Sequence, residues 1–116
     1  MRNEMTYEKY LEFVRTSCAA SKDAPVYRAL ASLHGKWRLP VVYELSKREG
    51  CSFGTLKCAL PNINNTMLLT TLKDLEKMGM VSCDRSEEIA KYALTEKGKA
   101  FCPIFYEIAK WAEAYL

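Results

Sequence analysis

The segment from Asn64 to Gly79 constrains the fold most, because it carries the signals for both ends of one helix. Asn64 is a favourable N-cap residue, since its side-chain oxygen can accept a hydrogen bond from an N–H group in the first turn. Gly79 suits the left-handed conformation that ends many helices. Leu68, Leu72 and Leu75 follow the i, i+4, i+7 spacing of a buried stripe. The opposite side carries threonines and lysines, so the sequence predicts an anchored helix that presents a polar face.

A short helix and a tight turn precede this segment. Ser52 can cap a helix that runs from Phe53 to Leu60. Pro61 and the asparagines that follow it then form the turn into the capped helix. A short helix, a tight turn and a second helix over residues 53–79 are the arrangement of a helix-turn-helix.

Helical periodicity also covers much of the N-terminal part of the chain. An amphipathic helix is predicted over residues 6–19. Pro25 occupies the favoured first turn of a second helix, which would direct Val26, Leu30 and Leu33 inward. A third helix is predicted over residues 37–47.

The period of the apolar residues changes from helical to two after the helix-turn-helix. Residues 80–84 and 89–94 alternate as strands do, and a polar turn lies between them, which predicts a β-hairpin wing over 80–95. A last helix over 96–116 carries a wide apolar stripe, and a second subunit is the expected cover for it. Helices, helix-turn-helix, hairpin and a last helix, in this order, predict a mainly α winged helix-turn-helix domain.

Length and composition are those of one globular domain, residues 1–116. Hydrophobic residues make up 49% of the chain and charged residues 27%, which is ordinary for a globular protein. The sequence has no run of about 18 apolar residues and no apolar core of a signal peptide near its start. We therefore expect a cytoplasmic protein without a membrane span.

The positive charge of the chain is concentrated in one region. Between Leu33 and Leu60 there are five positive and two negative side chains, which accounts for the whole net charge of +3. A basic region beside a presented helix is the electrostatic footprint that phosphate backbones select. A solvated surface with a chance excess of lysine and arginine would give the same count, so the charge alone decides nothing.

The five cysteines and the single histidine are scattered without the spacing of a metal site. No C-x-x-C pair is present, so we expect reduced thiols, no metal site and no cofactor. Cys18, Cys51 and Cys58 are candidates for redox sensing, whereas the alternative is that cysteines act as small apolar core residues. The sequence contains no phosphate loop, no Ser/His/Asp arrangement and no cluster of histidine with carboxylates, so no enzyme is predicted.

Four stretches carry a family resemblance, in order and spacing, from about Pro25 to the C-terminus. They are Pro25–Leu30, His34–Trp37, Phe53–Leu56 with Ala59–Ile63, and Tyr92–Gly98. In this order the chain resembles the HxlR-type winged-helix transcriptional regulators. The resemblance implies a homodimer joined through its N- and C-terminal helices. It also implies that the second helix of the helix-turn-helix enters the major groove, with the wing reaching the flanking backbone or minor groove.

The resemblance further implies which residues contact double-stranded DNA. The groove-facing positions correspond to Asn64, Asn65, Thr66, Thr70 and Thr71. The basic residues expected at phosphates are Lys36, Arg38, Lys57, Lys73, Arg85 and Lys91. The implied function is sequence-specific transcriptional regulation at a pseudo-palindromic operator. The sequence leaves open whether a small molecule or a redox signal acts as effector.

Three departures from the family pattern keep alternative functions open. Thr66 and Thr71 stand where family members usually have basic residues, and the wing turn is acidic, with Glu87 and Glu88. Both departures favour a winged-helix module that binds a protein partner and has given up DNA. The position at which many members carry a sensor cysteine is Ala24 here. The cysteines elsewhere in the chain leave a thiol-based redox regulator as the other alternative.

Overall fold

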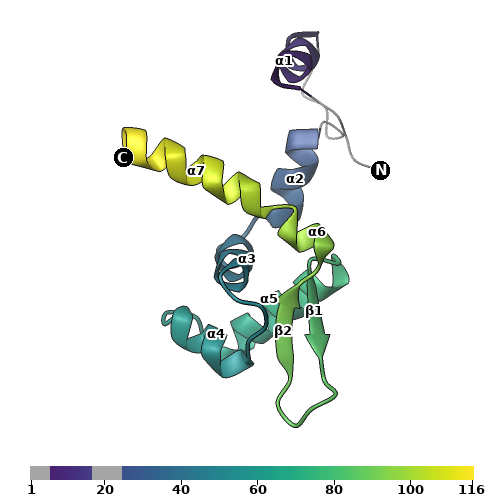
Figure 1. The fold of residues 1–116 in the computed structure, drawn as a ribbon, viewed down its shortest axis with the longest axis vertical. Helices are drawn as coiled ribbons and strands as arrows, with labels where there is room; N and C mark the ends of the chain where they lie inside the picture. The colour runs from purple at the N-terminus through teal and green to yellow at the C-terminus, as the bar shows by residue number, and fades with distance from the viewer. Residues whose placement is uncertain (1–5, 17–24) are drawn as a thin grey trace. The chain divides into compact units, whose positions relative to one another are not determined.

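The computed structural model describes residues 6–16 and 25–116, and the chain divides into two compact units, Met1–His34 and Gly35–Leu116. The first unit contains helices α1 (Tyr7–Thr16) and α2 (Pro25–Leu33). The elements of the second unit, in chain order, are α3 (Arg38–Ser46), α4 (Phe53–Ala59), α5 (Asn65–Lys77), β1 (Val81–Asp84), β2 (Lys91–Leu94), α6 (Glu96–Lys99) and α7 (Cys102–Tyr115) (Figure 1). None of the helices within the described ranges is long and apolar enough to cross a lipid bilayer.

The two N-terminal helices begin where the sequence predicts. Helix α1 lies within the predicted range 6–19, whose last residues fall outside the described part of the chain. Helix α2 begins at Pro25. The inward orientation predicted for Val26 and Leu30 is wrong for the chain as it stands, because both side chains are exposed. An apolar stripe marks the face of a helix that favours burial, but it does not supply the element that covers that face.

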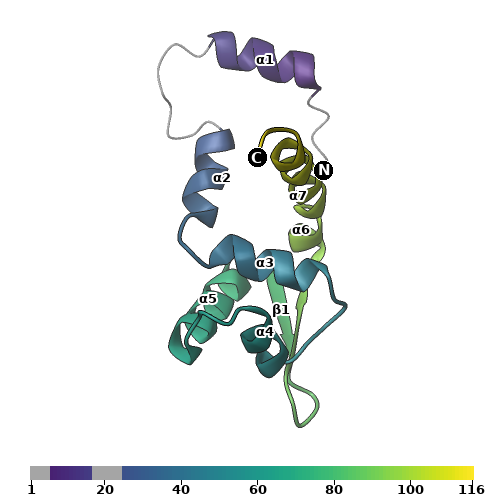
Figure 2. The ribbon, with the colours of Figure 1, turned by 90° about the vertical axis from the view of Figure 1, so that its left-hand side faces the viewer.

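Helix α3 lies at the centre of the second unit. Val41, Val42 and Leu45 have no exposed surface, and the helix contacts α4, α5, α7 and β2. Figure 2 shows α3 crossing α4 and α5. Pro40 is tolerated because it lies in the first turn, where its missing N–H would have no partner within the helix. The helix-turn-helix and the wing are therefore both positioned against α3.

The caps predicted for the helix-turn-helix are present. The Ser52 Oγ accepts a hydrogen bond from the Thr55 N–H at 3.2 Å, and the Asn64 Oδ1 accepts one from the Met67 N–H at 2.8 Å. Each of these oxygens satisfies a first-turn N–H that the helix leaves without a partner. Ile63, which precedes the second cap, is buried, as a hydrophobic residue before an N-cap commonly is.

The C-terminal end of α5 is a Schellman motif. Gly79 has φ +79°, which only glycine adopts without strain. Its N–H donates to the Glu76 carbonyl at 3.0 Å, and the Met80 N–H donates to the Leu75 carbonyl at 2.9 Å. Met80 and Leu75 are both buried. The predicted end of this helix is confirmed.

Strands β1 and β2 form the predicted antiparallel hairpin. Val81 pairs with Leu94 at one end and Asp84 with Lys91 at the other. Strand β2 begins at Lys91, two residues later than predicted, because Ile89 lies in the loop and is exposed. The loop projects from the second unit (Figure 1). Mainly α structure with one hairpin wing is the predicted winged helix-turn-helix fold.

Cys51 adds a third segment to the hairpin. Its N–H donates to the Tyr92 carbonyl at 2.9 Å, and the Tyr92 N–H donates to the Cys51 carbonyl at 2.7 Å. This antiparallel bridge joins the residue before the helix-turn-helix to the middle of β2. No local sequence pattern predicts this bridge.

The predicted last helix, 96–116, is broken into α6 and α7. Thr95 caps α6, since its Oγ1 accepts a hydrogen bond from the Gly98 N–H at 3.2 Å. The break falls at Ala100 and Phe101, and Pro103 lies in the first turn of α7, where it is tolerated. Pro103 therefore starts a new helix, which goes further than the predicted kink.

Two side chains near α6 hydrogen-bond to the end of α5. The Lys97 Nζ donates to the Met78 carbonyl at 2.7 Å, and the Thr95 hydroxyl donates to the Gly79 carbonyl. Carbonyls in this position lack partners within the helix, and a lysine also suits the negative end of the helix dipole. Residues of the following segment thus complete the C-terminal cap of α5.

Helix α7 carries large apolar side chains that the chain itself leaves exposed. Among its residues none is buried. The exposed ones are Ile104, Tyr106, Ile108, Trp111 and Tyr115. All of these except Tyr106 belong to the apolar stripe for which the sequence predicts a second subunit as cover.

Candidate functional site

The outward face of α5 presents hydrogen-bonding side chains on a rigid base. Asn65, Thr66, Thr70 and Lys73 are exposed, whereas the leucines on the opposite side of the helix have no exposed surface. Asn64 is exposed too, but its side-chain oxygen is engaged in the cap. Four of the five predicted groove-facing residues therefore lie at the surface of one helix and its cap.

Thr71 is the exception, and here the structure corrects the prediction. Its side chain is only 5% exposed. Thr71 follows Leu68 by three residues and precedes Leu75 by four, which places it within the buried stripe. A side chain in that position cannot reach a ligand in front of α5, so Thr71 is removed from the candidate contacts.

Ion pairs hold α5 from two sides. The Arg38 Nη2 lies 3.3 Å from the Asp74 Oδ2, which ties the start of α3 to α5. The Arg85 Nη2 lies 3.4 Å from the Glu76 Oε1, which ties the wing to α5. The partly exposed Arg38–Asp74 pair contributes roughly 0.2–1 kcal/mol to stability. Two of the predicted phosphate contacts, Arg38 and Arg85, thus have carboxylate partners and orient the helix.

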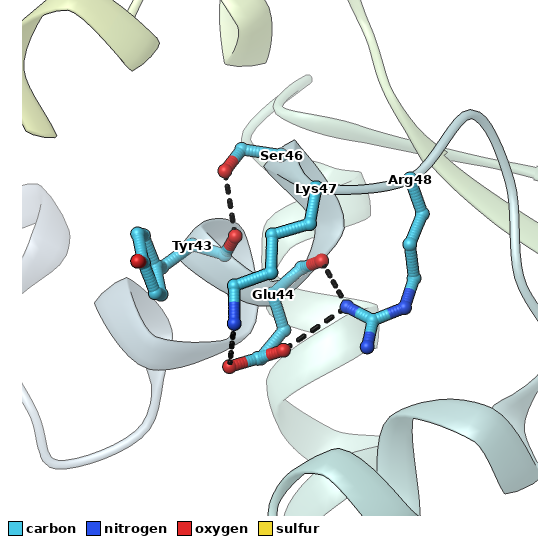
Figure 3. A network of polar contacts seen from close by, with 5 residues as sticks. All are labelled: Tyr43, Glu44, Ser46, Lys47 and Arg48. Carbon is cyan, nitrogen blue, oxygen red and sulfur yellow. Dashed lines mark hydrogen bonds and ion pairs between the residues drawn. The ribbon is translucent and has the colours of Figure 1, made fainter.

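A second polar network lies at the C-terminal end of α3 (Figure 3). Glu44 forms ion pairs with Lys47 at 3.1 Å and with Arg48 at 3.0 Å. Burial would raise the pKa of Glu44, but the hydrogen bonds and charges of Arg48 and Lys47 outweigh it and hold the pKa below its ordinary value. The Lys47 ammonium also lies 4.8 Å from the centre of the Tyr43 ring. One carboxylate therefore forms ion pairs with two of the basic residues counted in the sequence.

The remaining predicted cations lie on several elements. Lys36 precedes α3, is exposed, and has its ammonium 5.2 Å from the centre of the Trp37 ring. Lys57 is half-buried in the last turn of α4, and Lys91 is exposed at the start of β2. Of the five basic residues from Lys36 to Lys57, only Lys36 and Lys57 form no ion pair within the part of the chain that the structure describes.

The wing loop is acidic, as its sequence shows. Asp84, Glu87 and Glu88 are exposed. Hydrogen bonds from Ser86, helped by the charge of Lys91, lower the pKa of Asp84, so this carboxylate stays ionised at neutral pH. A carboxylate-bearing loop repels phosphate, which limits the contribution of the wing to binding a polyanion.

The candidate redox cysteines differ in their surroundings. Cys51 is buried, and burial raises the pKa of its thiol, which lowers the fraction of reactive thiolate. Cys58 is an exposed free thiol on α4. Cys18 lies outside the described residues. Within residues 6–16 and 25–116, no three side chains of His, Cys, Asp or Glu group as metal ligands do.

Residues 32–116 match the HxlR-like helix-turn-helix family. The uncharacterized HTH-type transcriptional regulator YdzF of Bacillus subtilis (strain 168) is 34% identical over 103 residues, which cover 84% of this chain and 93% of that protein. The family match over residues 32–116 includes the helix-turn-helix, the wing and the C-terminal helices.

Solved structures of transcriptional regulators share the fold. A proposed regulator of the MarR family from Porphyromonas gingivalis W83 superposes with a TM-score of 0.78 at 31% identity, over 84% of this chain and 98% of that chain. The redox regulator HypR in its reduced form superposes with a TM-score of 0.72 at 28% identity, over 78% of this chain and 92% of that chain.

Proposed function

Because the chain belongs to the HxlR-like helix-turn-helix family of transcriptional regulators, we propose that it binds a pseudo-palindromic operator in double-stranded DNA as a homodimer. Helix α5 enters the major groove, and the wing approaches the flanking backbone. DNA binding in the cytoplasm is the proposed activity, without catalysis. An effector, if one acts, changes the affinity for the operator.

The exposed face of α5 carries this proposal. Asn65, Thr66 and Thr70 offer amide and hydroxyl groups, which hydrogen-bond to the edges of bases. Sequence is read by such contacts and not by phosphate contacts, which position the protein. The cap at Asn64 and the ion pairs at Asp74 and Glu76 fix the helix before DNA arrives, so little ordering free energy is lost on binding.

The exposed apolar face of α7 supports the homodimer. Trp111 is 57% exposed, and its ring lies 6.0 Å from that of Tyr115, which is also exposed. An apolar face of this kind on a protein in water is commonly an interaction surface. A two-fold symmetric pair would present two copies of α5 about 34 Å apart, the spacing of half-sites on one face of the duplex.

The number of phosphate contacts is small in this proposal. Lys36, Lys57 and Lys73 are the cations of each subunit that we assign to phosphates. Each phosphate neutralised contributes about 0.9 to the slope of log affinity against log salt. We therefore expect a shallow salt dependence for a protein of this class, with base contacts and the two subunits supplying much of the affinity.

The proposal is tested by fluorescence anisotropy on duplex DNA from upstream of the protein's own gene, across a salt series, with a scrambled duplex of the same composition as control. We expect tighter binding to the upstream DNA and a negative salt slope. The absence of binding to either duplex at low salt would overturn the proposal. That outcome would instead favour a winged-helix module for a protein partner, which the acidic wing residues Glu87 and Glu88 motivate.

A further inference from the structure

The presented face of α5 is not entirely polar. Leu69 is 41% exposed and Met67 is 43% exposed, although the other leucines of the same helix from Leu68 to Leu75 are fully buried. Both residues lie in the first two turns, which is the part of a recognition helix that reaches base edges. Exposed apolar side chains at that position can contact apolar groups in the groove.

The spacing of the helix sorts these residues into rows. Asn65, Leu69 and Lys73 are four residues apart and form one row, so an amide, an apolar group and an ammonium follow one another along the helix. Thr66 and Thr70 form the adjacent row. Met67 lies on the other flank, in line with Asp74, which is paired with Arg38 of α3. Leu69 is thus the apolar residue that accompanies the hydrogen-bonding side chains.

The chemistry of these rows matches one class of base pair. An Asn amide pairs with N6 and N7 of adenine, and apolar groups or a Thr methyl contact the methyl group of thymine. Guanine is usually read by Arg or Lys, and no Arg or Lys occurs from Asn64 to Leu72. Building on the proposed function, we propose that the first two turns of α5 read A·T pairs, with Asn65 at adenine and with Leu69 and Thr70 at thymine methyl groups.

The test removes only the methyl groups. Half-sites are first selected from a random duplex library with the full chain, and each thymine of the selected site is then replaced in turn by deoxyuridine. We expect A·T pairs at the central half-site positions and a loss of affinity of about fourfold at one or two of them, the factor that corresponds to burying one methyl group. Deoxyuridine changes the DNA and leaves the protein intact, so misfolding cannot produce the effect.

Two variants assign the effect to one side chain. At the thymine that Leu69 contacts, Leu69→Ala should reduce the ratio of the affinity for thymine-containing DNA to that for deoxyuridine-containing DNA toward one. Met67→Ala, the matched loss of an exposed apolar group from the same helix, should leave this ratio unchanged. Selected half-sites rich in G·C pairs, or tight specific binding that deoxyuridine does not weaken, would overturn this inference and leave the proposed function intact. Failure to select any site would overturn both.

Discussion

Arg38 and Asp74 join the first turn of α3 to the last turn of α5, with 3.3 Å between Nη2 and Oδ2. The side chains are 26% and 38% exposed, so water screens the pair only in part. The two residues are 36 positions apart in the chain, so the ion pair connects α3 to α5 directly. Its main consequence is therefore positional, and its contribution to stability is small.

A double-mutant cycle with Arg38→Gln and Asp74→Asn tests this relationship. We expect a coupling free energy of roughly 0.5 kcal/mol in urea unfolding, within the range for partly exposed pairs. Asp74→Asn removes a negative charge that would repel phosphate, so a loss of operator affinity in this variant must come from losing the ion pair that holds α5 against Arg38. We expect such a loss. Tighter DNA binding by Asp74→Asn would show that its charge matters more than its position.

Asn64 and Asn65 are neighbours with different expected roles, since Asn64 caps α5 and Asn65 is proposed to contact DNA. Asn64→Ala removes the acceptor of the Met67 N–H and should lower the free energy of unfolding by about 1 kcal/mol. Asn65→Ala, one residue further along, removes an exposed side chain that caps nothing and should leave stability within about 0.5 kcal/mol. Urea denaturation of the two variants measures the difference. Equal destabilisation would contradict the cap.

The two adjacent threonines should respond differently to loss of the hydroxyl. Thr70→Val removes an exposed hydrogen-bonding group and should relax base preference, at a cost of about 1–3 kcal/mol in specific binding. Thr71→Val acts at a buried side chain and should leave the affinity of the folded protein nearly unchanged. Anisotropy with the selected operator measures both. If Thr71→Val lost more operator affinity than Thr70→Val, the face of α5 that we assign to DNA would be incorrect.

The ion pairs of Glu44 predict an acid-dependent term in stability. The pKa of Glu44 is lower in the folded chain than its ordinary value of 4.5. Its ionised form therefore stabilises the fold fully at pH values above that ordinary pKa. That contribution is lost as the pH falls through the lowered folded value. Glu44→Gln should therefore reduce the loss of stability on acidification from pH 5 toward pH 3. The exposed Glu49→Gln serves as control, and an identical pH profile for wild type and Glu44→Gln would contradict the prediction.

The face of α7 can be tested without DNA. Trp111→Glu places a charge in the apolar stripe and should shift the protein from dimer to monomer in sedimentation at micromolar concentration, with helix content retained. Lys110→Glu changes charge on the next residue, outside that stripe, and should leave the dimer intact. A wild-type protein that sediments as a monomer would overturn the proposed homodimer.

Local chemistry made most of the fold predictable. Ser52, Asn64 and Thr95 were recognisable as caps because the partner of each lies three residues away, and Gly79 was recognisable from the conformation it permits. The buried leucines of α5 followed from periodicity. A cap can be recognised from the sequence because the donor and the acceptor lie within one helical turn of each other.

What the sequence did not predict depends on distant residues. The bridge between Cys51 and Tyr92 joins segments about forty residues apart, and no local pattern marks it. Thr71 has the helical spacing of the buried leucines, but the sequence does not show how far the neighbouring elements extend over that side of α5 and bury it. The charge count in the sequence likewise could not show that Arg38 is paired with Asp74.

The contacts of Thr95 and Lys97 with the carbonyls that follow α5 link the helix-turn-helix to the C-terminal helices. These two side chains stand at the start of the segment that continues into α7, and they bind the Gly79 and Met78 carbonyls directly. A rotation of α6 must either carry the C-terminal end of α5 with it or break two hydrogen bonds. The orientations of α6 and of the C-terminal end of α5 are therefore coupled through two main-chain oxygen atoms.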